Sequence, residues 1–199
     1  MRILFQGDSI TDAGSYRKEY PEITGYCKLV AEILGTEHQY FNRGVSGNRS
    51  CDVLARYEDD IKAIAPDVMT LMIGINDVWR RFDACIYESA EEYGKNVREI
   101  LTRLKKDYPG VKIILIEPYL VPHAQKNYFR PVLAEFIQEI RAIAVELADG
   151  FVPTDGILAK ANMKIPAQLL SADGVHPAEA GQQVIAEAVA AEIKAVCNL

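Results

Sequence analysis

Short apolar runs alternate with amphipathic stretches along the whole chain, and this alternation limits the fold more than any other feature. The apolar runs are residues 3–5, a weaker run ending at 40–41, and then 68–73, 111–116 and 151–152. The runs at 68–73 and 111–116 are apolar almost throughout, which is typical of strands buried on both faces. Strands that alternate with helices form a parallel sheet through right-handed crossovers, with helices on both faces. We therefore expect an α/β fold.

The amphipathic stretches have the residue spacing of helices. A last helix is expected to begin at Pro177, because proline suits the first turn of a helix. The longest irregular stretches are expected at residues 10–25 and 153–177. The apolar positions with helical spacing are Tyr26, Leu29, Val30, Ile33 and Leu34; Val53, Leu54, Tyr57, Ile61 and Ile64; Tyr93, Val97, Ile100, Leu101 and Leu104; and Val132, Leu133, Phe136, Ile137, Ile140, Ile143 and Leu147.

Length and composition favour a single globular domain over residues 1–199, with 49% apolar and 25% charged residues. A net charge of −6 argues against sequence-independent binding to nucleic acid or to an anionic membrane, because both require a basic surface. Met1 leads directly into the first apolar run, without the apolar segment of a signal peptide, and no run has the length of a membrane span. These features predict a cytoplasmic protein.

The four cysteines are widely spaced, with no Cys-x-x-Cys pair, so the spacing of a metal or redox motif is missing. Three of them lie in or beside stretches expected to be helical, where we expect buried free thiols. No glycine-rich phosphate-binding motif follows the first strand, which leaves nucleotide binding with little support. The cysteines are Cys27, Cys51, Cys85 and Cys197.

Ser9, Asp173 and His176 have the chemistry of a nucleophile with its base. Ser9, at the end of the motif Gly7-Asp8-Ser9, follows the first apolar run, and ligands of such sheets bind beyond the carboxyl ends of the strands. A serine hydroxyl needs a base within hydrogen-bond reach, and that base needs an orienting partner. Asp173 lies three residues before His176, so its carboxylate can hold Nδ1–H while Nε2 faces the serine. His38 and His123 lack such a partner and are expected to be solvated.

A structural interpretation of the same residues stays open. Ser9 could be a helix N-cap, and the turn from Asp173 to His176 could cap the helix that follows it. Ser46 lies in a Gly-x-Ser-x motif that differs from a nucleophile elbow by one residue, since position 48 is Asn; it ranks below Ser9.

Acyl transfer also requires hydrogen-bond donors for an oxyanion. Asn76 offers a side-chain amide at the end of the run 68–73, and Gly44 offers a backbone N–H that can approach a ligand closely. Both segments could equally be ordinary turns, because Asn and Gly are frequent turn residues.

Taken together, these motifs resemble the four blocks of the SGNH hydrolases, also called GDSL esterases and lipases. The resemblance spans almost the whole chain and implies a three-layer α/β/α sandwich with a five-stranded parallel sheet of flavodoxin-like order 2-1-3-4-5. It implies Ser9 as nucleophile, Asp173 and His176 as its partners, and the Ser9 amide, Gly44 and Asn76 as the oxyanion hole. No metal or organic cofactor is implied. The blocks are Gly7-Asp8-Ser9-Ile10, Gly44 within residues 43–48, Gly74-Ile75-Asn76-Asp77 and Asp173-Gly174-Val175-His176-Pro177.

Residues 73–80 are similar to the branch that contains acetyl-xylooligosaccharide esterases. Trp79, the only tryptophan, could stack on a sugar ring, or it could be a core or interface residue. Arg80 could contact substrate, although a solvated or ion-paired role is open for it, and Asp8 is a further candidate for substrate binding. The Trp79 region could also serve as an interface in a homo-oligomer.

We therefore expect a serine esterase that removes small acyl groups, acetyl above all, from a carbohydrate such as a xylo-oligosaccharide. The alternatives are a lipase, thioesterase or lysophospholipase acting on longer acyl chains, and a non-catalytic carbohydrate-binding protein of the same fold. The absence of an extended apolar lid favours short acyl chains only weakly.

Overall fold

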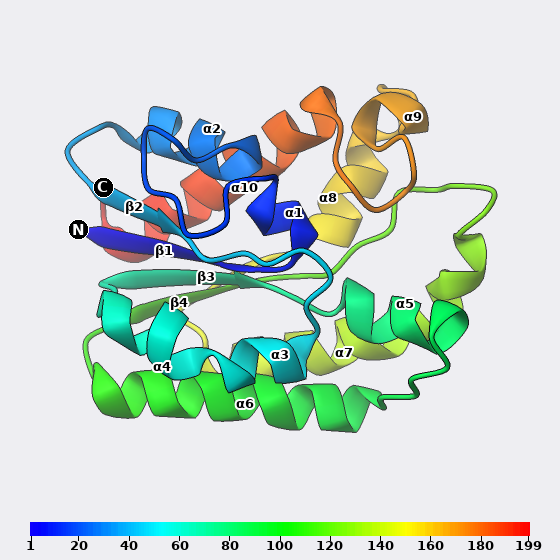
Figure 1. Ribbon diagram of the computed structural model, residues 1–199. Coiled ribbons are helices and arrows are strands. Elements are labelled where there is room, and N and C mark those ends of the chain that lie inside the picture. The colour runs from blue at the N-terminus through cyan, green and yellow to red at the C-terminus, as the bar shows by residue number, and fades with distance from the viewer.

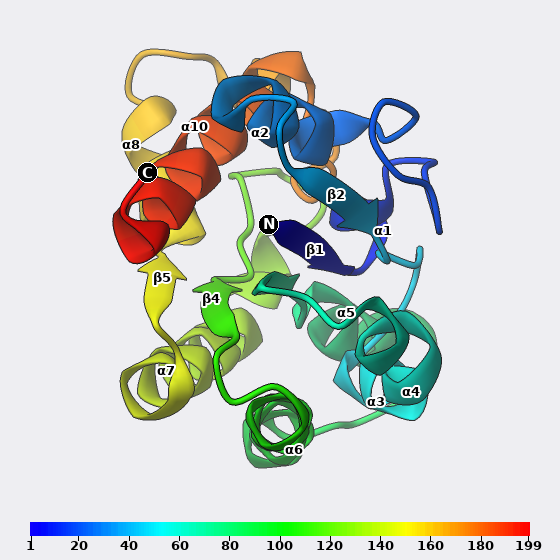
Figure 2. The same ribbon diagram turned by 90° about the vertical axis from the view of Figure 1, so that its left-hand side faces the viewer.

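The computed structural model describes all 199 residues, and a five-stranded parallel sheet forms its centre. Its order is β2-β1-β3-β4-β5, seen from the amino end of β1 in Figure 2. This arrangement confirms the α/β class and the strand order. The strands are β1 (Arg2–Gly7), β2 (Gln39–Asn42), β3 (Val68–Met72), β4 (Lys112–Ile116) and β5 (Gly150–Val152).

Helices cover both faces of the sheet, which confirms the three-layer sandwich (Figure 1). The C-terminal helix α10 packs against α2 on one face, while α6 packs against α7 and α3 on the other. The first layer contains α2 (Gly25–Leu34), α8 (Thr154–Ala161) and α10 (Glu179–Cys197), and the second contains α3 (Ser50–Ala55), α4 (Tyr57–Asp60), α5 (Ile75–Asp83), α6 (Ala90–Asp107) and α7 (Arg130–Leu147).

Burial on both sides explains why the central strands are apolar. Every residue of β3 is buried, and 52 buried apolar residues form one continuous cluster that includes both helix layers. The register pairs Gly7 of β1 with Met72 of β3, and Met72 with Ile116 of β4. The three central strands therefore end level with one another, and the loops that follow them begin at the same edge.

The helix expected across residues 53–64 is broken at Arg56 into α3, α4 and a 3-10 turn, η1 (Lys62–Ile64). The Arg56 side chain points inward, where it donates to Asp60 Oδ2 at 2.8 Å and to the Gly7 carbonyl at 3.1 Å. Apolar spacing continues through the break, so it could not reveal that a buried guanidinium interrupts the helix.

The stretch 153–177 is not irregular as expected, because it contains α8 and the short helix α9 (Ala167–Leu170). The last helix, α10, begins at Glu179 rather than at Pro177, which forms an isolated bridge with Ser171. The remaining short elements are α1 (Ser9–Asp12) and η2 (Asn127–Phe129). Of the elements α1, α8, α9 and η2, only α8 has more than four residues, and its amphipathic pattern is weak.

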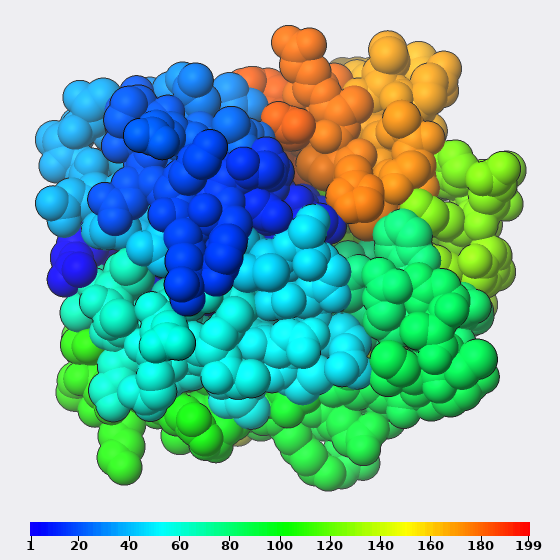
Figure 3. All heavy atoms as spheres, in the orientation of Figure 1, coloured from blue at the N-terminus to red at the C-terminus, as the bar shows by residue number.

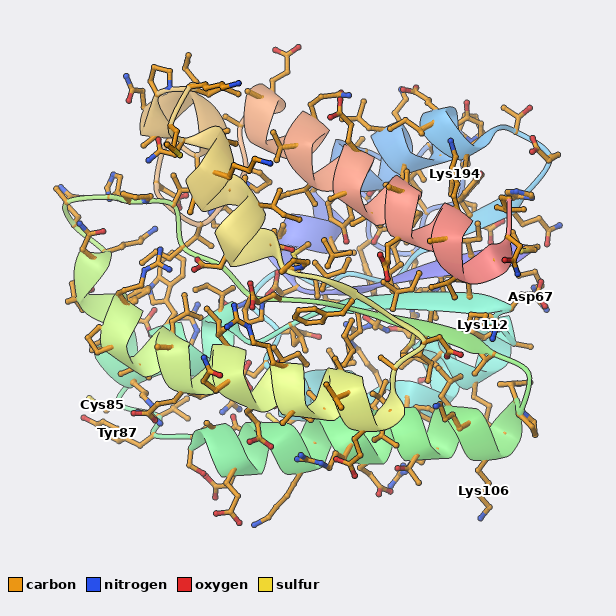
Figure 4. All side chains as sticks on the ribbon, turned by 180° about the vertical axis from the view of Figure 1, so that it is seen from behind. Asp67, Cys85, Tyr87, Lys106, Lys112 and Lys194 are labelled. Atoms are coloured by element: carbon orange, nitrogen blue, oxygen red, sulfur yellow. The ribbon has the colours of Figure 1, made fainter.

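All four cysteines are free thiols, but only one of them is buried as expected. Cys27 in α2 is buried, and burial raises the pKa of its thiol, whereas Cys85 is exposed in the connection between α5 and α6. Figure 4 shows Cys85 and Tyr87 at one end of the molecule, with Asp67, Lys112 and Lys194 at the other. No helix combines the length and the apolar character needed to cross a bilayer.

Candidate active site

The structure brings Ser9, His176 and Asp173 into one hydrogen-bonded chain. Ser9 Oγ lies 2.9 Å from His176 Nε2, and His176 Nδ1 lies 2.9 Å from Asp173 Oδ2. A carboxylate accepts hydrogen bonds only, so Nδ1 carries the imidazole proton and Nε2 accepts the serine hydroxyl. The two ends of the chain, separated by 167 positions, thus meet in the geometry that activates a hydroxyl.

Ser9 is the first residue of α1 and is not its N-cap. The cap is Asp8, whose Oδ1 accepts the Ile10 amide at 3.0 Å. Ser9 therefore keeps its hydroxyl free for His176, and the structural interpretation of Ser9 as a cap is wrong.

The loop that carries His176 is fastened from several sides. Asp173 Oδ1 accepts the backbone amides of Val175 and His176 at 2.9 and 2.8 Å, which closes a tight turn. The Tyr119 hydroxyl after β4 donates to the Val175 carbonyl at 2.7 Å. Gly174 has a φ of +87°, and a side chain there would lie 2.8 Å from the Cβ of His123. The imidazole is therefore presented by a rigid turn.

Lys126, which no motif in the sequence indicates, also contacts this turn. Its Nζ donates to Asp173 Oδ2 at 2.9 Å. Partial burial would raise the pKa of Asp173, but hydrogen bonds from Lys126 and His176 outweigh it and hold that pKa well below its ordinary value. Asp173 is thus a carboxylate throughout the neutral range.

Gly44 lies directly against α1. A side chain at this position would overlap the backbone of Thr11 and Asp12, so only glycine allows the close approach. Its amide donates to Asn42 Oδ1 at 2.8 Å, and Asn42 Nδ2 in turn donates to the Thr11 carbonyl. The loop after β2 and the helix that begins with Ser9 are held together through Asn42.

Asn76 is buried at the start of α5, and its Nδ2 donates to the Asn48 carbonyl at 3.0 Å. The neighbouring Asp77 accepts both the amide and the hydroxyl of Ser50, at 3.0 and 2.7 Å. These bonds join the loop after β2 to the loop after β3. An amide nitrogen carries two hydrogens, so Asn76 retains one for another acceptor.

Asp8 and Asp77 are buried carboxyl groups beneath this edge of the sheet. Desolvation raises the pKa of each to about 7, and the charge of Asp77 contributes to the shift of Asp8. Asp8 Oδ2 is buried without a hydrogen-bond partner. Asp8 was also a candidate for substrate binding, but its side chain is only 1% exposed on the free protein and instead caps α1.

Trp79 borders the hydrogen-bonded chain on the α5 side. Its ring centroid lies 6.3 Å from that of His176 and 5.7 Å from that of Phe129, and the indole is partly buried. The guanidinium of Arg80 lies 5.8 Å from the Trp79 ring and forms an ion pair with Asp83. Both residues are placed beside the site, and Arg80 is ion-paired in the free protein.

Neither His38 nor His123 is hydrogen-bonded to Ser9. His38 was expected to be solvated, but its side chain is only 10% exposed and packs against Tyr40. His123 is half-buried beside Gly174, with Nδ1 lacking a partner. No group of three or more histidine, cysteine, aspartate or glutamate side chains is arranged to hold a metal ion.

The surface view shows these segments meeting on one face. In Figure 3 the N-terminal segment (blue), the segment around α5 (green) and the loop before α10 (orange) come together. They belong to different parts of the sequence, and each follows the carboxyl end of a strand or precedes the last helix.

Residues 5–184 match the GDSL-like lipase/acylhydrolase family. The chain belongs to this family. It is accordingly a carboxylic ester hydrolase, and the resemblance inferred from the four sequence blocks is confirmed.

Relatives of this GDSL hydrolase include an acetylxylan esterase from Geobacillus stearothermophilus, 32% identical, with 96% of this chain and 93% of the relative covered. The crystal structure of that esterase superimposes with a TM-score of 0.86 over the same shares. Variants of it have been solved in which one serine or one histidine is replaced, and they are described as catalytic mutants. An α/β hydrolase from the Lake Arreo metagenome is 29% identical, with a TM-score of 0.86 over 98% of this chain and 95% of its own.

Proposed function

We propose that this GDSL hydrolase is a serine esterase that removes acetyl groups from acetylated carbohydrates such as xylo-oligosaccharides. The observation that carries the chemistry is the chain of hydrogen bonds from Ser9 through His176 to Asp173. The substrate class is suggested by the similarity to an acetylxylan esterase over nearly the whole chain.

In the proposed reaction, Ser9 Oγ attacks the ester carbonyl while His176 Nε2 takes the hydroxyl proton. Asp173 holds the imidazole by its Nδ1–H and stabilises the positive charge that forms on it. The short distance from Ser9 Oγ to Nε2, 2.9 Å in the free protein, supports a direct proton transfer.

The negative charge of the tetrahedral intermediate would be stabilised by the amides of Ser9 and Gly44 and by the Asn76 side chain. The Ser9 amide lies in the first turn of α1, where helix N–H groups lack internal partners. The Gly44 N–H donates to Asn42 Oδ1, so an oxyanion would either share this hydrogen with Asn42 or displace Asn42 from it. Asn76 is aimed by its bond to the Asn48 carbonyl and keeps its second hydrogen for the oxyanion.

His176 then protonates the leaving alcohol, which departs and leaves the acetyl group on Ser9. A water molecule, activated by the same imidazole, hydrolyses this acyl-enzyme and restores the serine. The exposed side chain of His176 leaves room for both the alcohol and the water. The Trp79 indole beside it offers an aromatic face for the sugar ring, and Arg80 could donate to sugar hydroxyls if it leaves Asp83.

Covalent labelling tests the proposed nucleophile. A fluorophosphonate probe should modify Ser9, and labelling should be lost in Ser9→Ala. Ser46→Ala is the matched control, because Ser46 is the exposed serine of the Gly-x-Ser-x sequence and should label as the wild type does. Labelling that persists in Ser9→Ala, or no labelling of the wild type, would contradict the proposal.

Substrate preference is tested separately. Acetate release should be measured from acetylated xylo-oligosaccharides, other acetyl sugars and a p-nitrophenyl ester series from acetate to palmitate. We expect the acetyl esters to give the highest kcat/KM, with the oligosaccharides above simple esters. A preference for chains beyond about eight carbons would instead favour the lipase or thioesterase alternative, and activity on simple esters alone would remove the sugar assignment.

A further inference from the structure

Lys126 lies between the Asp173 carboxylate and the Trp79 ring. Its Nζ donates to Asp173 Oδ2 at 2.9 Å, the same oxygen that lies 2.9 Å from His176 Nδ1. The ammonium also lies 4.0 Å from the centroid of the Trp79 ring, within range of a cation–π interaction. The lysine side chain is only 14% exposed, whereas that of Asp173 is 38% exposed, so the ion pair is partly shielded from water.

The backbone around Lys126 is held by a tight turn. The His123 carbonyl accepts the amides of Lys126 and Asn127, both at 2.9 Å, and Asn127 Oδ1 accepts the His123 amide at 3.0 Å. Phe129 follows in η2, where it is fully buried and packs against Trp79. The lysine is thus anchored on both sides, and its contact with Asp173 is part of the packed structure.

We propose that Lys126 is a positioning residue that holds Asp173 beside His176 and contacts Trp79, and whose ammonium offsets part of the Asp173 charge facing the imidazole; this role rests on the proposed esterase function. The positive charge of the ammonium offsets part of the negative charge of the Asp173 carboxylate. Without the ammonium, the full negative charge would stabilise a protonated imidazole. Loss of this positive charge is therefore expected to favour the protonated imidazole.

Other charged or titratable groups surround the imidazole, but they make different contacts. Arg80 on α5 lies over the Trp79 ring and pairs with Asp83, Asp8 is buried behind Ser9, and His123 flanks Gly174. Among these groups and Lys126, only the lysine ammonium is hydrogen-bonded to the Asp173 carboxylate. Its removal should therefore change the charge felt by His176 more than the removal of any of the others.

Trp79 provides a direct readout, because it is the only tryptophan and its ring lies 6.3 Å from the His176 ring. A protonated imidazole quenches a neighbouring indole, so Trp79 emission should titrate with His176, and this transition should vanish in His176→Gln. The experiment compares the midpoint of the emission titration in the wild type, Lys126→Met and Lys126→Arg.

In Lys126→Met we expect the midpoint to rise by roughly 0.5–1 pH unit, because a nearby positive charge is lost from a partly solvated site. The acidic limb of kcat/KM on p-nitrophenyl acetate should move by the same amount, with activity retained on the alkaline plateau. Lys126→Arg keeps the charge and should titrate close to the wild type.

The matched control is Lys112→Met. Lys112 also pairs with an aspartate, Asp149 at 3.2 Å, but it lies at the opposite end of the molecule from Cys85 and Tyr87 (Figure 4). Its removal should leave the midpoint unchanged.

An unmoved midpoint in Lys126→Met, or an equal loss of activity at every pH, would overturn the role of Lys126. Failure of the proposed function would be seen differently, as a wild type without esterase activity. The fluorescence midpoint would still measure the effect of the lysine on His176 in that case.

Discussion

At the residue scale, Asn76 is the side chain whose proposed contribution is easiest to isolate. Its replacement by alanine removes the proposed oxyanion donor and one hydrogen bond to the Asn48 carbonyl. We expect Asn76→Ala to lower kcat by ~10²–10³, because the donor acts on charge that develops in the transition state. The fold should lose only about 1 kcal/mol of stability.

The measurement is kcat and KM on p-nitrophenyl acetate alongside a denaturant melt of the same variant. Unchanged turnover in a folded Asn76→Ala protein would rule out the role given to this amide.

Asp8 should make the stability of the protein depend on pH. Desolvation raises its pKa to about 7 in the folded state, whereas the unfolded chain ionises near the ordinary value of 3.8. Below about pH 4 Asp8 is protonated in both the folded and the unfolded state, so its titration does not change the free energy of unfolding. Between about pH 4 and 7 the unfolded state ionises first, so the folded wild type loses stability as the pH rises.

Asp8→Asn keeps an oxygen to cap α1 and removes this titration. We expect the unfolding free energy of the variant, minus that of the wild type, to rise between pH 4 and 7 by up to about 4 kcal/mol. Urea melts across this range measure it, with the exposed Asp59→Asn as control. A difference that stays constant with pH would show that Asp8 is not held protonated.

At the element scale, the break between α3 and α4 depends on Arg56. Asp60 is fully buried and pairs with Arg56 at 2.8 Å and with the half-exposed Arg17 at 3.0 Å. We expect Arg56→Met to cost about 3–5 kcal/mol, because it leaves a buried carboxylate with only an exposed partner. Arg17→Met should cost less, about 1 kcal/mol or below, since an exposed pair contributes little.

Equilibrium urea unfolding of both variants tests this order of effects. Equal losses in Arg56→Met and Arg17→Met would mean that the buried pair does not hold the α3–α4 break in place.

The elements that sequence patterns predicted well are those whose burial is regular. The buried strands and the long helices α6 and α7 follow directly from apolar spacing, and the loops after the strands share one edge as expected. The break at Arg56 escaped prediction because a buried arginine leaves no trace in that spacing. The short helices α1 and α9 have too few residues for a period to be visible.

Among the candidate site residues, those at the ends of strands could be found because each follows its own apolar run. Lys126 could not, since it lies in a loop after β4 and its partners, Asp173 and Trp79, are distant in the sequence. The capping role of Asp8 was likewise hidden, because Ser9 beside it is an equally good capping residue type.

At the scale of the whole molecule, the sheet makes the site by ending its three central strands at one level. Ser9 follows β1, Asn76 follows β3, and the loop after β4 is fastened to the His176 turn by the bond from the Val121 amide to the Gly174 carbonyl at 2.8 Å. A rigid framework of this kind holds the groups at this edge in place, so that no reorganisation would be needed during the proposed reaction.

The most direct test of this account is to stop the enzyme during turnover of an acetyl ester and locate the acetyl group by mass spectrometry. We predict one acetyl group on the peptide that contains Ser9, and none in Ser9→Ala, whose hydrolysis should fall to the background rate. An acetyl group on another residue, or continued turnover by Ser9→Ala, would contradict the assignment of Ser9 as the nucleophile.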